Sequence, residues 1–331
     1  MPYVDQLNLN GNVGDLVGCD GCAYEGENLQ TKFASEIASY NSAWDWILAR
    51  ITNGNFSKIH VGDYIPVSCT NGNTFMARIA GINTYRGIGD TAVGNHIDFI
   101  SASLWPVPVK MNLIDTNQGS STTYPWPWTV SNGYYFLNSL SGNVQGGTNA
   151  NPASQAVDYT QGGIYYHLPY ALKSVIVDKY MPLPKRYLTS GKITRDNGWS
   201  WANAGKLWIP TETELTGASV WGGTRYGAAG SIQYPLFASR GLNRTSNRYA
   251  FWTSTAVHGN ATHFVAVNAG SAGSISYAAA SSDLYTLICF RVAAANANGA
   301  NHTMAVDTIS LDDGLTVATP SETLSWVTQE D

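Results

Sequence analysis

A helical pattern of apolar residues is the first clear periodicity along the chain. Between Leu29 and Ile51, hydrophobic side chains recur three or four positions apart, and Asn28 is suited to cap the N-terminus of a helix. Asn53-Gly54 should end this helix. We therefore predict one continuous amphipathic helix, whose aromatic stripe packs either into the core or between subunits.

The pattern then changes to the shorter period of β-strands. Segments 59–68, 74–83 and 96–103 are rich in β-branched and aromatic residues, and are separated by an Asn-Gly-Asn turn and a Gly-containing loop. They predict an antiparallel hairpin or meander. Further strands are predicted at 251–254, 263–267, 274–278 and 286–292.

Other segments between these strands give weaker signals. Residues 167–179 carry apolar side chains on one side, which predicts a second helix, and the prolines that follow should end it. Residues 115–132 and 141–163 show no periodicity and predict long surface loops. Thr211 and Glu214 have the spacing of a capping box, which predicts a helix start. Few helices and many short strands joined by Gly-containing turns indicate the α+β class.

The two ends of the chain differ from its middle. Residues 1–27 are rich in Gly and Asn with isolated apolar positions, and they predict an extended arm that docks on a neighbour. After Val292, an Ala- and Asn-rich stretch predicts a flexible linker, followed by short strands that add to a partner or wrap a neighbouring subunit. A partly ordered terminus is the alternative for this tail.

The low charge of the chain narrows the choice of partners. Only 12% of its 331 residues are charged, against about 25% in an average soluble protein, and the net charge is −5. No basic stripe is available to neutralise a run of phosphates, so we expect no nucleic-acid partner. Tyr, Ser, Gly and Asn are abundant instead, as on adaptable binding surfaces, although β-rich domains often share this composition.

We also expect no membrane insertion. No stretch approaches the roughly 18 uninterrupted apolar residues of a membrane helix. The segment from Met1 to Asp5 lacks the basic and apolar regions of a signal peptide. The expectation is therefore synthesis in the cytoplasm, with release by lysis or assembly.

The cysteines predict structural thiols. Cys19 and Cys22 have the spacing of metal ligands, but no second pair completes a four-ligand site, so we expect no metal and leave only this pair open. Cys289 lies in an apolar strand and is interpreted as a core residue.

Three runs in the second half of the chain carry a resemblance to a known fold. Lys206 to Leu215 reads Lys-Leu-Trp-Ile-Pro-Thr-Glu-Thr-Glu-Leu, Phe251 to Thr255 reads Phe-Trp-Thr-Ser-Thr, and Ile288 to Val292 reads Ile-Cys-Phe-Arg-Val. Together they resemble landmarks of the C-type-lectin-like fold of formylglycine-generating enzymes and retroelement-diversified phage tropism proteins. The resemblance implies a scaffold that brings these runs together and presents loops for binding.

The wider chain is similar to a family met mostly in phages and prophages of anaerobic gut bacteria. This similarity spans roughly residues 56–296, which we assign to the lectin-like domain. From their sequence patterns, residues 1–55 are assigned to an N-terminal arm and helix for assembly, and 297–331 to an assembly tail. The further matching runs are Val61 to Asp63, His96 to Ile100, Tyr134 to Leu140 and Gln233 to Phe237.

Four residues of the landmarks are expected to have structural roles. Glu212 and Arg291 come from two different landmarks, and a buried carboxylate needs a cationic partner, so we predict an ion pair between them beneath the loops. Trp208 and Trp252 are the two aromatic members of the set.

The resemblance does not extend to catalysis. In enzymes of this fold, cysteines in the active cleft and a bound metal carry the oxidative chemistry, whereas Cys289 occupies the position of a family Gly and has no second cysteine near it in sequence. The calcium-ligand runs of true C-type lectins and a Gly-x-Ser-x-Gly elbow are also missing from the sequence. We expect no enzyme activity, no catalytic residue and no cofactor. An oxidoreductase like the formylglycine-generating enzymes is an alternative function that this expectation disfavours.

Segment 253–303 contains no Lys, Glu, Gln, Met or Trp. These five residue types cannot arise by mutation of the adenines of an Asn codon that ends in a pyrimidine. In retroelement-diversified proteins the corresponding segment is the one that varies. Diversification by a retroelement is therefore one hypothesis, and the chance composition of a neutral β-rich segment is the other.

The resemblance and the composition together predict a phage virion protein, made in the host cytoplasm and exposed on the particle, that binds a bacterial surface receptor. This receptor is a glycan or a protein. We expect a homo-oligomer in contact with other virion proteins; a capsid or tail decoration protein with an outward lectin-like domain is the alternative. The candidate receptor contacts lie in loops 255–287 and in the preceding Gly-rich loop, and comprise His258, Asn260, Thr262, Asn268, Ser271, Ser274, Ser276, Tyr277, Asp283, Arg225 and Tyr226.

Overall fold

A computed structural model gives the arrangement of most of the chain. The described residues are 6–9, 12–15, 26–86, 93–119, 125–148, 151–186, 188–189, 192–193, 199–222, 232–239, 249–268 and 274–293. Within the N-terminal arm, β1 (Gln6–Leu9) pairs with β2 (Asn12–Asp15). The predicted linker and tail after Ala293, and the Cys19 and Cys22 pair, lie outside the described residues.

A six-stranded sheet organises the core. Its order is β14-β19-β5-β4-β3, with β9 also paired to β19, and every pairing is antiparallel. The predicted meander of three strands is confirmed as β3, β4 and β5. All residues of β5 and β19 are buried, so both faces of this part of the sheet are covered. The strands are β3 (Tyr64–Ser68), β4 (Thr74–Ile82), β5 (His96–Ser101), β9 (Ile176–Val177), β14 (Leu207–Trp208) and β19 (Cys289–Ala293).

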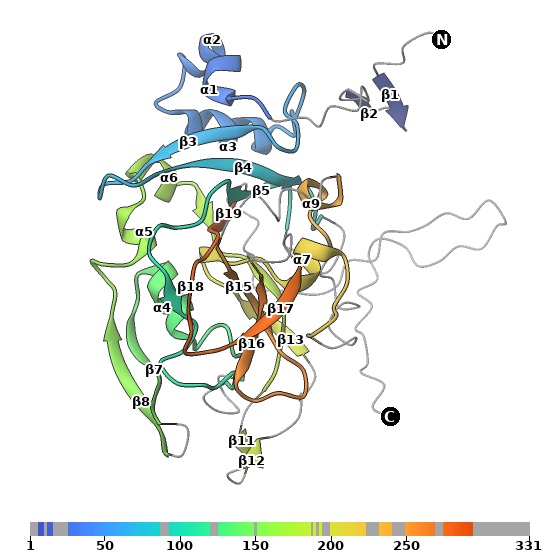
Figure 1. The fold of residues 1–331 in the computed structure, drawn as a ribbon. Helices are drawn as coiled ribbons and strands as arrows, with labels where there is room; N and C mark the ends of the chain where they lie inside the picture. The colour runs from blue at the N-terminus through green and yellow to red at the C-terminus, as the bar shows by residue number, and fades with distance from the viewer. Residues whose placement is uncertain are drawn as a thin grey trace, which may run out of the picture.

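The N-terminal helical segment covers one side of this sheet (Figure 1). It consists of α1 (Leu29–Lys32), α2 (Ala34–Ile37) and α3 (Ala43–Thr52), so the prediction of one continuous helix is wrong. The chain restarts at Ser42, whose side chain accepts the backbone N–H of Asp45 and caps α3. The indole of Trp44 then packs edge-on against the rings of Phe99 and Phe290, at 5.5 and 5.8 Å between ring centroids. Phe33 and Trp44 of the aromatic stripe therefore belong to the core of this chain, whereas Tyr40 is 41% exposed.

Three other sequence predictions are corrected. Instead of a helix over 167–179, the chain forms α5 (Ile164–His167), α6 (Tyr170–Lys173) and β9, because Pro169 has an extended backbone and β9 pairs with β19. Instead of a loop, residues 141–148 and 151–158 form two antiparallel strands, β7 (Ser141–Thr148) and β8 (Asn151–Asp158). In segment 115–132, Asn117, Gln118 and Trp128 are at most 2% exposed, so these residues are interior.

A second, three-stranded sheet lies on the other side of the central sheet from α1, α2 and α3 (Figure 1). It has the order β15-β16-β17, with β15 (Phe251–Ala256), β16 (His263–Val267) and β17 (Ile275–Ala279). The predicted helix start at Thr211 is confirmed, since a complete capping box opens α7 (Glu212–Thr216). The remaining elements are α4 (Asn132–Asn138), α9 (Pro235–Ser239), β6 (Val109–Lys110), β10 (Tyr180–Pro184), β11 (Leu188–Thr189), β12 (Lys192–Ile193), β13 (Trp199–Asn203) and β18 (Asp283–Leu284).

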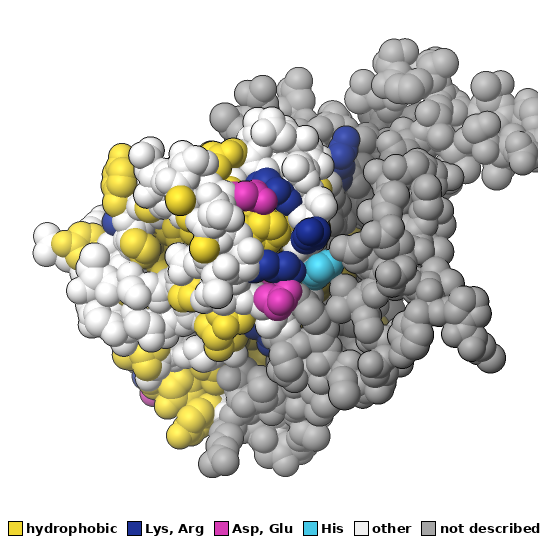
Figure 2. Space-filling view, turned by 90° about the horizontal axis from the view of Figure 1, so that it is seen from above, with side chains coloured by type: hydrophobic (Ala, Val, Ile, Leu, Met, Phe, Trp, Pro, Cys, Tyr) yellow, Lys and Arg dark blue, Asp and Glu magenta, His cyan; other side chains and the backbone are white. Residues whose placement is uncertain are grey.

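The architecture is mixed, with mostly antiparallel strands in several sheets and few helices, as the α+β prediction requires. Across the described part of the chain, no helix is both long enough and apolar enough to cross a membrane. Figure 2 shows that few charged side chains lie on the described surface seen from above, and that most of those in view lie close together.

Candidate functional site

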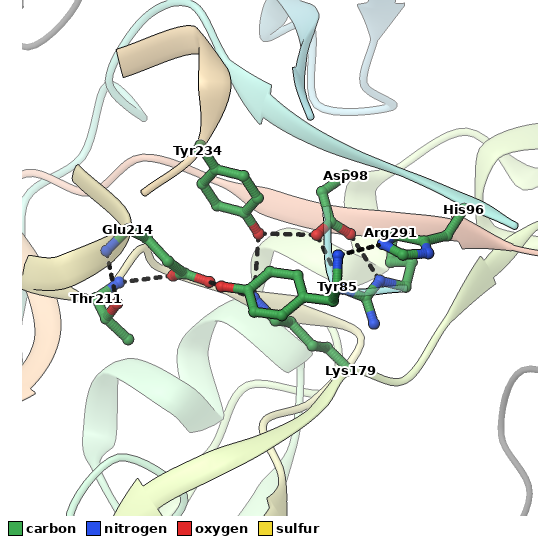
Figure 3. Close-up of polar contacts among 8 residues, drawn as sticks. All are labelled: Tyr85, His96, Asp98, Lys179, Thr211, Glu214, Tyr234 and Arg291. Carbon is green, nitrogen blue, oxygen red and sulfur yellow. Dashed lines mark hydrogen bonds and ion pairs between the residues drawn. The ribbon is translucent and has the colours of Figure 1, made fainter. Parts of the chain in front are cut away.

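Two adjacent strands of the central sheet bring a buried arginine and a buried aspartate together (Figure 3). Arg291 on β19 is in register with Asp98 on β5, and its Nε and Nη2 lie 2.7 and 2.9 Å from the two carboxylate oxygens. Neither side chain is more than 1% exposed. The predicted ion pair between Glu212 and Arg291 is therefore not formed, because Arg291 is matched by Asp98.

Burial and charge shift the pKa values of Asp98 and Arg291 in opposite directions. Burial alone would raise the pKa of Asp98, but the charge and hydrogen bonds of Arg291 outweigh it and hold that pKa well below its usual range. Burial alone would lower the pKa of Arg291, and the carboxylate of Asp98 instead raises it. Both groups are thus fixed in their charged forms.

His96, two residues before Asp98, is kept neutral. Its Nε2 accepts the backbone N–H of Tyr85 at 3.2 Å, so the ring hydrogen is on Nδ1, which donates to the carbonyl of Gly94 at 2.8 Å. Burial, reinforced by the positive charge of Arg291, lowers the pKa of His96 to about 4. This uncharged ring closes the loop that leads into β5.

A second buried pair joins the first through a tyrosine hydroxyl (Figure 3). Lys179 forms an ion pair with Glu214, and neither side chain is exposed. The hydroxyl of Tyr234 accepts a hydrogen bond from Nζ of Lys179 at 3.1 Å and donates to Asp98 at 3.0 Å. Tyr85 donates to the carboxylate of Glu214 at 2.5 Å. Two ion pairs from distant parts of the sequence therefore form one hydrogen-bonded network.

Aromatic rings and a helix cap complete the surroundings of this network. Nζ of Lys179 lies 4.4 Å from the ring centre of Tyr85 and 4.6 Å from that of Trp208. The other oxygen of Glu214 accepts the backbone N–H of Thr211 at 2.8 Å, as the capping box requires. Among the described residues, no group of three His, Cys, Asp or Glu side chains could hold a metal ion. Since the charged groups are buried and paired, the network is best interpreted as a structural centre that joins α7, β5 and β19.

Glu212, the first residue of α7, fixes an exposed loop next to this centre. Its carboxylate accepts the backbone N–H groups of Val220 and Trp221, each at 3.0 Å, and that of Gly222 at 2.9 Å. The indole N–H of Trp221 donates to the carbonyl of Ile275 at 3.4 Å. Although Trp221 is 36% exposed, its backbone and its ring are both held in place.

Three rings form a row from this loop across the second sheet. The rings of Trp221 and Tyr277 lie 4.8 Å apart at an angle of 71°, and those of Tyr277 and His263 lie 5.3 Å apart at 81°. Tyr277 belongs to β17 and is 44% exposed, whereas His263 begins β16. Exposed aromatic rings that are fixed by the backbone can bind a ligand with little loss of side-chain entropy.

Hydrogen bonds at one end of this row indicate which ring nitrogen of His263 carries the hydrogen. Oδ1 of Asn260 accepts the backbone N–H of Thr262 at 2.8 Å and the hydroxyl of Thr262 at 2.9 Å, which identifies this atom as the amide oxygen. Nδ1 of His263 lies 3.0 Å from the same oxygen, so Nδ1 carries a hydrogen. In the neutral ring, Nε2 is then a hydrogen-bond acceptor, and no described residue donates to it.

Two interior side chains hold the turn between β15 and β16 from below. The guanidinium of Arg186 donates to the carbonyls of Val257 and Asn260, at 2.7 and 2.8 Å. The side-chain amide of Asn117 donates to the carbonyls of Asn260 and His263, at 2.7 and 2.5 Å. Arg186 is 2% exposed and Asn117 is not exposed. The turn is thus attached to the core at two of its carbonyl groups, and the start of β16 at a third.

The predicted contacts fall into several groups. His258, Asn260, Thr262 and Tyr277 lie together. The backbone N–H of His258 donates to the carbonyl of Trp221, whose ring contacts Tyr277. Asn260 and Thr262 contact the imidazole of His263, which also contacts Tyr277. Together with Trp221 and His263, they form what we call the recognition face. Trp221 and His263 were missed by the sequence prediction, although the five-residue spacing of the two histidines was a signal.

The other predicted contacts do not join this face. Ser276 alternates with Tyr277 along β17 and therefore points to the opposite side of the sheet. Asn268 and Ser274 lie at the far end of the β16–β17 hairpin, and Asp283 is exposed on β18. Arg225, Tyr226 and Ser271 lie outside the described residues.

The two tryptophans that were assigned structural roles are fully buried. Trp208 packs beneath Lys179, and the indole N–H of Trp252 donates to the carbonyl of Val109 at 2.8 Å. Cys289 is also buried in β19, and burial raises the pKa of its thiol well above the usual value.

Comparisons with known proteins identify no relative for this chain: no family model, no curated protein and no solved structure matches it.

Proposed function

We propose that this chain is a phage virion protein that displays a C-type-lectin-like domain and binds a bacterial surface receptor through the recognition face. The arrangement of the landmark runs supports the fold assignment. Trp208 in the first run is in register with Cys289 in the last, and the end of the first run forms most of α7. The second run forms β15, whose sheet carries part of the recognition face.

The observation that carries the binding function is the fixation of exposed rings on an uncharged surface. Trp221 and Tyr277 expose a third or more of their surface. The loop of Trp221 is nevertheless tied to Glu212, and β17, which carries Tyr277, pairs with β16, whose preceding turn is held by Arg186 and Asn117. Tyr and Trp often dominate the energy of protein binding surfaces. A rigid scaffold with aromatic and small polar contacts is therefore suited to recognition.

A decoration protein of the capsid or tail is the second candidate. A second exposed aromatic site favours it, since Tyr166 on α5 and Tyr170 on α6 are 47% and 84% exposed. Large exposed apolar side chains are typical of contact surfaces. In that case, Tyr166 and Tyr170 would attach the protein to a lattice of other virion proteins or of its own copies.

Binding to whole cells tests the receptor function. The purified, fluorescently labelled chain is incubated with a panel of intestinal anaerobic bacteria, and bound label is counted by flow cytometry. We expect Trp221→Ala and Tyr277→Ala to lower binding by about tenfold or more, because each removes a fixed ring. Tyr170→Ala is the matched control and should bind like the unchanged chain. Equal binding by all three variants would rule out the recognition face.

The position of the protein on a particle separates the two candidates. Antibody-gold labelling in electron micrographs should place it at the tail tip if it binds the receptor. An ordered array over the head, with no effect of Trp221→Ala on cell binding, would favour decoration.

A further inference from the structure

The geometry of the aromatic row limits which ligand can bind it. The rings of Trp221 and Tyr277 meet at 71°, so they form an angled apolar surface rather than a flat one. Aromatic rings combine a large apolar area with a defined orientation. The C–H groups on one face of a sugar ring form a flat apolar surface of matching size, and they can pack against one of these rings while the other ring contacts the edge of the sugar.

At the end of the aromatic row formed by His263, the ligand must supply a hydrogen-bond donor. The hydrogen of Nδ1 of His263 is directed to Asn260 and Thr262, which lie 3.0 and 2.7 Å from it. Nε2 therefore remains as an acceptor next to the ring of Tyr277. A sugar hydroxyl donates one hydrogen bond and so fits this position. A carboxylate or a phosphate oxygen offers only lone pairs to it.

The lack of charged residues among the members of the recognition face also favours an uncharged ligand. The members of the recognition face include no Lys, Arg, Asp or Glu. The carboxylate of Glu212, which holds the loop of Trp221, already accepts three backbone N–H groups, and the guanidinium of Arg186 is buried against carbonyl groups. From the described residues of this face, a strongly charged ligand would gain no counter-charge to offset its lost hydration. A neutral ligand has no such cost.

We propose that the recognition face binds a neutral carbohydrate of the bacterial surface, with a sugar ring packed on Trp221 and Tyr277 and a sugar hydroxyl donating to Nε2 of His263. This inference rests on the proposed receptor function and specifies its ligand. These contacts use no metal ion, so carbohydrate binding persists in the presence of EDTA.

A glycan microarray with neutral mono- and oligosaccharides of glucose, galactose, mannose, rhamnose and N-acetylglucosamine tests the ligand class. The full chain should bind at least one of these glycans with and without EDTA. We expect Trp221→Ala, Tyr277→Ala and His263→Phe each to weaken binding by about tenfold or more. Tyr277→Phe keeps the ring and should stay within about threefold of the unchanged chain, and Tyr170→Ala should have no effect. Near-ultraviolet circular dichroism of each variant verifies that the fold is retained.

Treated cells separate failure of this inference from failure of the receptor function. Periodate oxidation of surface glycans should abolish cell binding, and digestion with protease should leave it unchanged. If protease abolishes a binding that depends on Trp221, the receptor is a protein, and the carbohydrate assignment fails while the receptor function stands. Both proposals fail if cell binding does not depend on Trp221, or if the chain binds neither cells nor glycans.

Discussion

Arg291 and Asp98 face each other across neighbouring strands, and the guanidinium meets both carboxylate oxygens at 2.7 and 2.9 Å. These residues are 193 positions apart in the chain. A slip of β19 by one residue would turn Arg291 to the opposite face of the sheet and leave two buried charges without partners. The pair therefore selects one register for a short strand whose other residues are apolar or small.

Loss of one member of this pair should strongly destabilise the fold. We expect Asp98→Ala to lower the free energy of unfolding by about 3 to 5 kcal/mol, because it leaves a buried guanidinium without its carboxylate. Urea denaturation followed by tryptophan fluorescence measures this change. Asp283→Ala, at an exposed carboxylate, is the control and should change stability by no more than about 0.5 kcal/mol. Similar losses for both variants would show that the Asp98 pair is not specially important.

Acid should weaken the fold through His96. The pKa of His96 is about 4 in the folded chain and about 6.5 in an unfolded one, so between these pH values the unfolded chain binds more protons. Stability due to the neutral ring is complete above pH 6.5 and declines as the pH falls towards 4. From pH 7 to pH 5, this effect amounts to about 2 kcal/mol.

Urea midpoints at pH 7 and pH 5 measure the contribution of His96. The pKa of Asp98 is held well below this range, so that carboxylate remains charged throughout. His96→Gln can still accept the backbone N–H of Tyr85 but has no proton to gain, and its midpoints should differ less between the two pH values. An unchanged pH dependence in this variant would contradict the assignment.

Tyr234 should couple the two buried ion pairs energetically. Tyr234→Phe removes the hydroxyl that contacts both Lys179 and Asp98, and should lower the free energy of unfolding by about 1 to 3 kcal/mol. Tyr85→Phe removes the other tyrosine hydroxyl of the network, and the double variant should deviate from additivity. Tyr249→Phe, at a ring that is 59% exposed, is the control. Additive effects of Tyr85 and Tyr234 would mean that the pairs act independently.

Glu212 should control the order of the loop that carries Trp221. Glu212→Gln leaves a single carbonyl oxygen for three backbone N–H groups, so the amide hydrogens of 220–222 should exchange with solvent about tenfold faster or more. Hydrogen exchange with mass spectrometry measures this rate. Glu36→Gln, which alters a surface ion pair with Arg50, should leave exchange at 220–222 unchanged. If both variants leave it unchanged, Glu212 does not position the loop.

Local patterns were sufficient for much of the fold. The alternation in β3, β4 and β5 and the capping box at Thr211 are properties of nearby residues, and both were correctly predicted. The wrong predictions arose where pairing with a distant segment overrides the local sequence pattern. Ile176 and Val177 continue a helical pattern, yet they form a strand because β19 offers its edge to them.

The site was harder to predict because its partners come from distant segments. Asp98 lies in an apolar run, which signals a buried carboxylate with a cationic partner, but nothing local shows that the partner is Arg291. Trp221 is fixed because the backbone N–H groups of 220–222 donate to Glu212. These hydrogen bonds cannot be predicted from the residue types in the loop. Landmark runs indicated which elements meet, whereas the individual side-chain pairs required coordinates.

The place of β19 in the sheet has a consequence for biogenesis. This strand is the last one described in the chain, yet it lies between β14 and β5, and Phe290 packs against Trp44 from the N-terminal helices. A ribosome delivers Cys289 to Ala293 only after every other strand of that sheet has been made. Until then, the nascent polypeptide has an open edge on β5 and an uncovered aromatic cluster, both of which favour aggregation. Productive folding must therefore wait until translation has passed Ala293.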